Sequence, residues 1–406
     1  MDWKAFGFRD DPLTTSPIMQ STLALFTGHQ EERQVCSHLL MGSNVRLVIE
    51  GARGVGTTSF ANYLRFSAEA KKLYFTPKTE IKVEQGWRLE TLLAAIISNL
   101  IRELELTLEK VIIDKRFQAA KALSSHISEA YRSFGVDAFG FGLNYGKQAG
   151  VVTQPIIIPS TTLGHHLEDL ISLIKENGYS KGVIFQLNNL DIGEIHRQED
   201  MKYLLNALRD YTQMEGSSWL LVGDHGLRKF IAQQVDRLDD IISYEVTINP
   251  IPMTDLAEMI DKRIHFYRES ENIELPVEKE VFDYLYQITN GRLRYIFGLI
   301  SRLMSKLYIG DLIAKVTLDI AKPMLTKLGK DRMQRSDVTN SEAELLQILV
   351  RLGNATASIV AKQSQKSSQY VGRTFLRLIE KGLVSYKKEG RDKIYSPAID
   401  AIIAYA

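Results

Sequence analysis

The feature that most constrains this chain is a glycine-rich loop that lies between a predicted strand and a predicted helix. Residues 45–50 form a short apolar strand, and residues 58–70 have the apolar spacing of a helix. Such a setting is typical of the phosphate-binding pattern GxxxxGK[ST], whose backbone N–H groups and helix N-terminus face phosphate oxygens. The sequence therefore predicts a nucleotide cradle made by Gly51, Gly54, Val55, Gly56, Thr57 and Thr58.

This loop lacks the lysine that its pattern requires. Thr57 stands at the lysine position, while Thr58 keeps the hydroxyl that would bind Mg²⁺. A hydrogen bond from a charged group to phosphate contributes about 1.5–3 kcal/mol, so its loss predicts roughly tenfold to hundredfold weaker nucleotide binding. Arg53 is a conceivable substitute, although its place in the loop argues against it. The alternative is a phosphate-loop fold that no longer holds nucleotide.

A second motif has lost charge as well. The buried strand predicted at residues 182–187 leads into Asn188, Asn189 and Asp191, where a Walker B strand should end in Asp-Glu. Asparagine keeps the shape of these side chains, but it neither neutralises a metal nor accepts a proton from water. Asp191 falls three residues past the expected ligand. ATP or ADP therefore remains the expected cofactor, the case for Mg²⁺ is weak, and efficient hydrolysis is not expected.

The rest of the chain predicts an α/β architecture. Strands alternate with helices over residues 26–250, which favours a mostly parallel sheet covered on both faces, and residues 251–330 look like a helical lid. Residues 1–25 look like an irregular N-terminal lead-in. Alternating large and small residues near 134–159 predict an inserted hairpin, which either packs or protrudes as a subunit or DNA contact.

The C-terminal residues 337–406 have the element order of a winged helix, after a polar linker at residues 330–340. A capping-box pattern at Ser341–Glu344 opens the first helix, a second covers residues 356–363, and a third covers 369–381. A hairpin over residues 385–395 follows. Helix, turn, helix and wing is an arrangement that binds DNA.

Positive charge is concentrated in this C-terminal region. Between residues 362 and 393 nine Lys/Arg oppose three acidic residues, although the whole chain has a net charge of only +1. Such a local excess is the electrostatic footprint of a partner rich in phosphate, here double-stranded DNA. The alternative is a winged helix that docks a protein. The residues expected to contact DNA are Lys366, Ser368, Gln369, Arg373, Arg377, Lys387, Lys388, Arg391 and Lys393.

With these motifs in order, the chain resembles an AAA+ ATPase of the origin-recognition and replication-initiator type. Residues 26–32 resemble the box that precedes the first helix, and residues 219–224 resemble the sensor 1 strand, with Asp224 near its polar residue. Residues 289–294 resemble the sensor 2 turn. The resemblance implies that Arg294 reaches the γ-phosphate; a structural salt bridge is the alternative. It also implies oligomers of AAA+-like subunits, with Arg237 near the place of the arginine finger.

We therefore expect a DNA-binding AAA+-like protein with weak or absent ATP hydrolysis. It would act as a clamp or regulator on duplex DNA, controlled by nucleotide or by oligomeric state, in replication initiation, transposition or mobile-element defence. A non-catalytic adaptor that recruits an effector enzyme is the first alternative, and a slow ATPase is the second. No apolar stretch approaches the roughly 20 residues of a spanning helix, and the single cysteine suits a reducing compartment, so a cytoplasmic location is expected.

Overall fold

The computed structural model describes residues 2–133, 158–192, 195–308, 315–389 and 392–405 of the chain. The chain forms two compact units: one is Ser16–Asn249, and the other combines Met1–Thr15 with Pro250–Ala406. It therefore passes between the units twice. The hairpin predicted near residues 134–159 falls almost wholly outside the described residues.

The unit Ser16–Asn249 is built on a five-stranded sheet in the order β2–β3–β4–β1–β5, and all its strand pairs are parallel. The central strand β4 and its neighbour β3 are buried along their whole length, as expected of a parallel sheet covered on both faces. The strands are β1 (Arg46–Gly51), β2 (Ile81–Lys82), β3 (Val183–Asn188), β4 (Ser217–Gly223) and β5 (Tyr244–Ile248).

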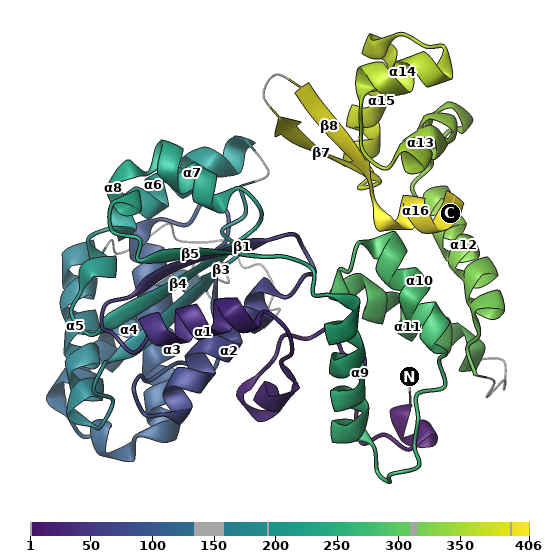
Figure 1. Cartoon of the computed structure of the whole chain (residues 1–406). Helices are drawn as coiled ribbons and strands as arrows, with labels where there is room; N and C mark the ends of the chain where they lie inside the picture. Colours follow the sequence, from purple (N-terminus) through teal and green to yellow (C-terminus); the bar gives the residue numbers. More distant parts are fainter. Residues whose placement is uncertain (1, 134–157, 193–194, 309–314, 390–391, 406) are drawn as a thin grey trace. The chain divides into compact units, whose positions relative to one another are not determined.

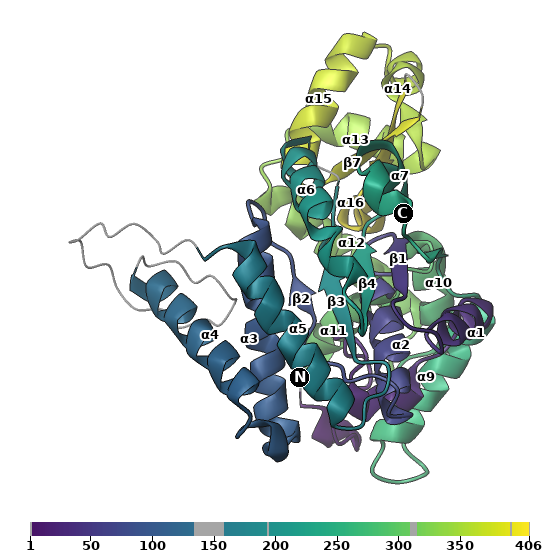
Figure 2. The same ribbon diagram turned by 90° about the vertical axis from the view of Figure 1, so that its left-hand side faces the viewer.

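Helices cover this sheet on two sides, as Figure 2 shows with α2 on one face and α3 and α5 on the other. The larger core lies under α3 and α5, where apolar residues of both helices surround Phe185 and Trp219. Helix α4 was not among the predicted elements. The helices are α1 (Gln30–Leu39), α2 (Thr57–Ala70), α3 (Leu89–Thr107), α4 (Lys115–Ser133), α5 (Ser160–Glu176), α6 (Ile195–Leu208), α7 (Leu227–Gln234) and α8 (Asp236–Asp239), with short 3₁₀ turns at Gln20–Leu25, Glu109–Val111 and Tyr211–Gln213.

The second unit begins with the N-terminal residues, which pack on the lid. Trp3 and Phe8 are buried, Arg9 N donates to Tyr267 O at 2.7 Å, and Arg263 Nη1 donates to Thr14 O at 3.0 Å. The predicted lead-in is therefore divided between the two units. The lid helices are α9 (Met253–Tyr267), α10 (Lys279–Thr289), α11 (Leu293–Tyr308) and α12 (Leu318–Arg335), and a 3₁₀ turn covers Trp3–Phe6.

A winged helix completes this unit (Figure 1). Helix α12 continues to Arg335, through part of the expected linker, because its apolar side packs on α16. The two helices come so close at Gly329 that an added Cβ would lie 2.6 Å from Ala404 N. The winged helix comprises α13 (Asn340–Leu352), β6 (Ala355–Thr356), α14 (Ala357–Ser364), α15 (Ser368–Glu380), β7 (Val384–Glu389), β8 (Asp392–Pro397) and α16 (Ile399–Tyr405), with antiparallel strands in the order β6–β8–β7.

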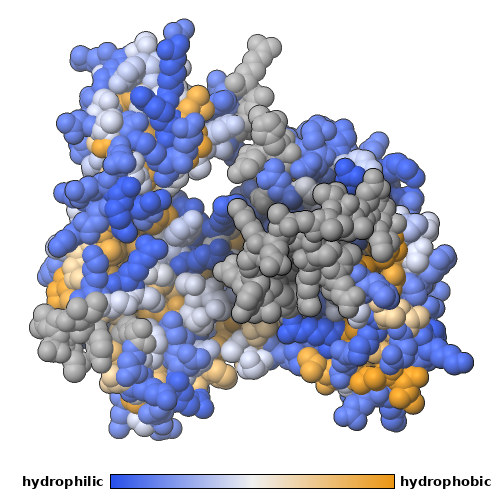
Figure 3. Space-filling view, turned by 180° about the vertical axis from the view of Figure 1, so that it is seen from behind, coloured by the Kyte–Doolittle hydropathy of each residue, from blue (hydrophilic) through white to orange (hydrophobic). Residues whose placement is uncertain are grey.

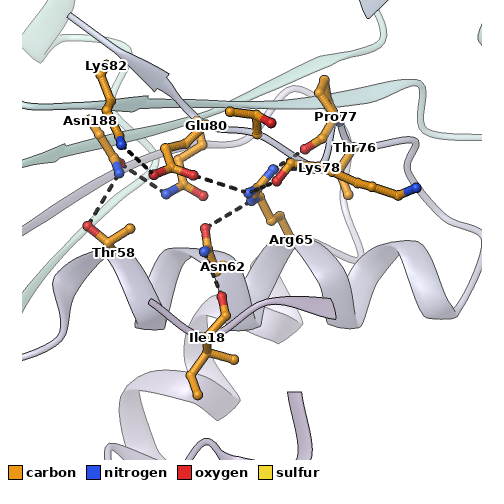
Figure 4. Close-up of polar contacts among 12 residues, drawn as sticks. Ile18, Thr58, Asn62, Arg65, Thr76, Pro77, Lys78, Glu80, Lys82 and Asn188 are labelled. Carbon is orange, nitrogen blue, oxygen red and sulfur yellow. Dashed lines mark hydrogen bonds and ion pairs between the residues drawn. The ribbon is translucent and has the colours of Figure 1, made fainter. Parts of the chain in front are cut away.

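A buried guanidinium fixes the helix that follows the glycine-rich loop. Arg65 on α2 is 1% exposed, donates from Nη2 to Lys78 O at 2.9 Å, and also donates to Pro77 O. Its Nε donates to Asn62 Oδ1 at 3.2 Å, and Asn62 Nδ2 in turn donates to Ile18 O at 2.7 Å (Figure 4). These bonds tie α2 to the segment that enters β2 and to the segment that precedes the sheet.

Replacing Arg65 with alanine is expected to lower the melting temperature of the unit Ser16–Asn249. Breaking a buried ionic network costs about 3–5 kcal/mol, which corresponds to roughly 6–20 °C in a domain of this size. Differential scanning calorimetry of the full chain measures the shift. The control Arg237→Ala removes an exposed arginine of the same unit and should change little. Equal melting of Arg65→Ala and wild type would contradict this role of Arg65.

Candidate functional site

The glycine-rich loop turns tightly between β1 and α2. Gly54 and Gly56 have φ of 90° and 111°, in the left-handed region that glycine adopts without strain. A Cβ added at Gly51 would lie 2.6 Å from Ile248 O on β5. The loop ends at the N-terminus of a helix of 14 residues, where backbone N–H groups have no partner within the helix. This backbone fits a phosphate group.

The two predicted motifs meet at a pair of uncharged side chains. Asn188 ends β3 and is 3% exposed, and its Nδ2 donates to Thr58 Oγ1 at 3.3 Å. Gln186, on the same face of β3, donates from Nε2 to Asn188 Oδ1 at 3.0 Å. An amide thus faces the hydroxyl expected to bind Mg²⁺. Among the described residues, no group of three or more His, Cys, Asp or Glu is arranged to hold a metal ion.

The other two Walker B positions lie away from this pair. Asn189 is exposed and has a left-handed backbone, with φ of 64°. Asp191 Oδ2 accepts from Arg53 Nη2 at 3.2 Å, so the carboxylate nearest the motif forms an ion pair with the loop's arginine. Arg53 is accordingly bound to Asp191 in this structure. Two contacts therefore join the Walker B region to the loop: Asn188 with Thr58 and Asp191 with Arg53.

The residue at the predicted sensor 1 position has a structural contact. Asp224 follows β4, and its Oδ1 accepts from Ile192 N at 3.0 Å. Burial raises the pKa of the Asp224 carboxyl, although the hydrogen bond from Ile192 N acts in the opposite direction. Asp191 raises the pKa of Asp224 further and Arg53 lowers it. Asp224 therefore holds the segment that follows β3 beside the end of β4.

Two charged residues at this end of the sheet were missed by the sequence analysis. Lys82 on β2 is paired in register with Asn188 on β3, and Glu80 precedes it by two residues. Lys82 Nζ lies 3.8 Å from Glu80 Oε1. The alternation Glu80, Ile81, Lys82 and Val83 carried the signal, because residues two apart in a strand point to the same face.

The arginines predicted from the resemblance remain predictions. Arg294 is exposed at the start of α11, in the unit that does not contain the glycine-rich loop. Its neighbour Arg292 instead donates from Nε to Thr289 O at 3.0 Å and lies over the Tyr295 ring. Arg237 is exposed on α8. No described contact joins Arg294 or Arg237 to a nucleotide site.

The predicted DNA-contacting helix is α15, whose N-cap is Ser367. Ser368, Gln369, Arg373 and Arg377 are exposed on it, as expected of residues that meet a groove. Tyr370 and Leu376 are exposed beside them and were not predicted. The visible face of the winged helix is mostly hydrophilic (Figure 3).

Several of the predicted cations have partners inside the protein. Lys366 Nζ lies 2.5 Å from Glu344 Oε2, and Arg377 Nε lies 3.5 Å from Glu342 Oε1. On the wing, Lys387 and Lys393 are exposed, with Lys393 Nζ over the Tyr386 ring at 4.8 Å. The side chain of Lys388 and the whole of Arg391 lie outside the described part of the structure.

Glu342 is the buried anchor of this cluster of cations. The capping box is formed by Thr339 and Glu342, not by the predicted Ser341–Glu344, because α13 begins at Asn340. Glu342 is 1% exposed, and Lys381 Nζ contacts its Oε2 at 2.8 Å. Burial alone would raise the pKa of this carboxyl, but the hydrogen bonds from Lys381 and the capping box hold the pKa below its ordinary value.

Known proteins resemble the C-terminal part of the chain in sequence and the whole chain in fold. Residues 338–404 match the family described as Penicillinase repressor. No curated protein is significantly similar to the chain in sequence. Among solved structures, the ORC2 protein of Aeropyrum pernix, in ADPNP–ADP complexes, has a TM-score of 0.53 at 12% identity, covering 98% of this chain and 96% of that one.

Two more solved structures match a similar share of the chain but have lower TM-scores. The ORC1 protein of Aeropyrum pernix, in complex with DNA, has a TM-score of 0.48 at 13% identity and covers 97% of this chain and 95% of its own. Cdc6p of Pyrobaculum aerophilum has a TM-score of 0.41 at 14% identity and covers 97% of each chain. The likeness to the ORC2 structure, the parallel sheet and the family match at residues 338–404 confirm the predicted fold class: a parallel AAA+ sheet like that of the ORC2 structure, with a lid and a C-terminal winged helix.

Glu342→Gln is expected to destabilise the winged helix in a pH-dependent way. Because the folded-state pKa lies below the unfolded value, the carboxylate's contribution is complete above about pH 4.3 and is lost as pH falls through the folded-state pKa. At neutral pH the variant should lose about 1.5–3 kcal/mol, as expected for hydrogen bonds to a charged group. Calorimetry between pH 3 and 7, with about one pH unit per step, measures the difference in unfolding free energy between the variant and wild type.

Glu344→Gln is the matched control, because Glu344 lies on the same helix but is exposed. An exposed ion pair contributes only about 0–1 kcal/mol. If both variants had the same pH profile, the buried position of Glu342 would have no part in stabilising the winged helix.

Proposed function

We propose that this protein binds double-stranded DNA through its winged helix and binds ATP or ADP with little or no hydrolysis. The observation that carries the proposal is the exposed face of α15, where Gln369, Arg373 and Arg377 lie on a helix of winged-helix topology. Amide and guanidinium groups are the usual donors to base edges and phosphates. The exposed Lys387 and Lys393 on the wing add charge for the DNA backbone.

Weak or absent hydrolysis follows from the groups at the loop. A bound triphosphate would find backbone N–H groups and the hydroxyl of Thr58, which serve binding. Asn188 and Asn189 supply no carboxylate to hold a metal or to orient the attacking water. Nucleotide would then act by stabilising one conformation or one oligomeric state of AAA+-like subunits. A role in replication initiation, transposition or mobile-element defence, in the cytoplasm, belongs to the same proposal.

Nucleotide complexes of a similar solved structure support this proposal by analogy. The ADPNP–ADP complexes are those of the ORC2 protein of Aeropyrum pernix. We extend nucleotide binding to this chain because the loop backbone fits phosphate. No helix among the described residues is long and apolar enough to cross a membrane.

A non-catalytic adaptor is the second candidate. Tyr370 and Leu376 are 38% and 48% exposed on α15, and apolar side chains of this size suit a protein partner as well as a DNA groove. The ion pairs of Lys366 and Arg377 also reduce the charge offered to phosphate. An adaptor would show DNA affinity that does not depend on the wing.

Charge reversal on the wing tests DNA binding. The triple variant Lys387→Glu, Lys388→Glu and Arg391→Glu should weaken binding to a fluorescent duplex and flatten its salt dependence. Each lost phosphate contact removes about 0.9 from the slope of log affinity against log salt. Fluorescence anisotropy at several salt concentrations measures both quantities.

The control reverses three exposed lysines of the other unit, Lys71, Lys110 and Lys229. It makes the same change in net charge and should leave the affinity and the slope near those of wild type. Equal effects of the two triple variants would favour nonspecific attraction. Unchanged binding by the wing variant would favour the adaptor.

ATP turnover should be far below that of ordinary enzymes. Phosphate release by the full chain, with and without duplex DNA, should stay at least a hundredfold below the typical value of about 10 s⁻¹. Thr58→Ala identifies contaminating activity, since turnover at this site needs the hydroxyl. Turnover near the typical value that Thr58→Ala abolishes would contradict our interpretation of Asn188 and Asn189.

A further inference from the structure

A polar wall faces α2 at the edge of the sheet formed by β2 and β3. The register pairs Ile81 with Leu187 and Lys82 with Asn188. Ile81 and Leu187 belong to the apolar core under α3 and α5. Lys82 and Asn188 therefore point to the opposite face, toward α2, because successive side chains in a strand alternate between faces. Glu80 and Gln186 lie on this face too.

We propose that Lys82 supplies the phosphate-binding ammonium that the glycine-rich loop lacks at position 57, with a nucleoside triphosphate as the ligand. This inference rests on the nucleotide-binding part of the proposed function. In place of a lysine at the end of the loop, the site would use a lysine from the edge strand β2, which pairs with β3. The sequence motif then looks incomplete although the site retains a cation.

The geometry brings Lys82 to the loop in two steps. Asn188 Nδ2 lies 3.3 Å from Thr58 Oγ1, so the end of β3 touches the first turn of α2. Paired strands lie only about 4.8 Å apart, and lysine carries its charge on a flexible four-carbon stem. Figure 4 shows Lys82 beside Asn188, and Asn188 above Thr58. The Lys82 side chain is 65% exposed, which leaves it able to reorient.

The present partner of Lys82 is easily exchanged. Its Nζ lies 3.8 Å from Glu80 Oε1, whereas Glu80 Oε2 lies 3.9 Å from Arg65 Nη2. Glu80 would therefore keep the buried guanidinium as a partner if Lys82 moved to a phosphate. The Lys82–Glu80 pair is long, and its lysine end is 65% exposed, so it adds little stability. An ammonium–phosphate hydrogen bond is charge-assisted and strong. A triphosphate would thus compete well for Lys82.

A buried acceptor in the same wall points independently to a missing ligand. Gln186 is 3% exposed, and its Oε1 has no hydrogen-bond partner in the described structure, although its Nε2 is bound to Asn188. Buried polar atoms are rarely left unpaired in folded proteins. A water of the hydrated phosphates or the reoriented Lys82 ammonium would supply the donor. The loop's own cation has the closer partner: Arg53 Nη2 lies 3.2 Å from Asp191 Oδ2, whereas Lys82 Nζ lies 3.8 Å from Glu80 Oε1.

Titration with a fluorescent ATP analogue tests the inference on the full chain. Lys82→Met keeps the stem and removes the charge, and it should weaken binding by roughly tenfold or more, as expected for a lost charged hydrogen bond. Lys78→Met is the matched control: Lys78 lies four residues earlier, is 52% exposed and also pairs with an acid, Glu103, at 3.4 Å. This control should bind ATP as wild type does.

A rescue variant separates a phosphate contact from a structural effect. Thr57→Lys restores the lysine of the pattern, so the double variant Thr57→Lys, Lys82→Met should regain most of the lost affinity. Rescue would show that the defect of Lys82→Met was the missing charge. Absence of rescue, with the double variant melting at the wild-type temperature, would overturn the inference.

Three other results would also overturn it: no ATP binding by the wild type, unchanged binding by Lys82→Met, or equal weakening by Lys78→Met. Duplex binding without nucleotide, measured on the same samples, keeps this inference apart from the DNA-binding proposal. Lys82→Met should bind DNA as wild type does. A chain that binds ATP through Lys82 but ignores DNA would refute DNA binding and leave the role of Lys82 intact.

Discussion

The placement of the site depends on the buried guanidinium of Arg65. Burial lowers the pKa of Arg65 to about 10, yet the group stays charged at neutral pH and gives its hydrogen bonds to Asn62 and to the carbonyls of Pro77 and Lys78. A buried cation held by fixed acceptors permits little sliding of α2. Arg65 thus fixes α2, whose N-terminus ends the glycine-rich loop, to the segment that leads into β2.

The centre of the candidate nucleotide site consists of uncharged side chains, and charged side chains lie around it. The Gln186–Asn188–Thr58 chain of hydrogen bonds joins the sheet to the loop through uncharged side chains. Ion pairs stand to either side, Glu80 with Lys82 and Asp191 with Arg53. This distribution suits holding a polyphosphate more than cutting it, since cutting requires preorganised charge where the transition state develops it.

The winged helix shows that local net charge and available charge are different quantities. Glu342 engages Arg377 and Lys381, and Glu344 engages Lys366, so part of the positive excess stabilises the domain itself. Arg373 is exposed on α15, and Lys387 and Lys393 are exposed on the wing, where Lys393 lies over the Tyr386 ring. Counting residues along the chain could not separate these two groups, because it ignores which carboxylates fold against them.

The sequence by itself determined the local features. Periodicity and steric rules between near neighbours in the chain predict the strand, glycine loop and helix, and the order of the winged-helix elements. The amides at Asn188 and Asn189 are read directly from the sequence. Only the tertiary structure decided the rest: Lys82 beside Asn188, α12 extended to Arg335 against α16, and Glu342 rather than Glu344 at the cap. These outcomes depend on strand register and helix packing, which join residues far apart in the chain and leave no fixed spacing for a sequence to reveal.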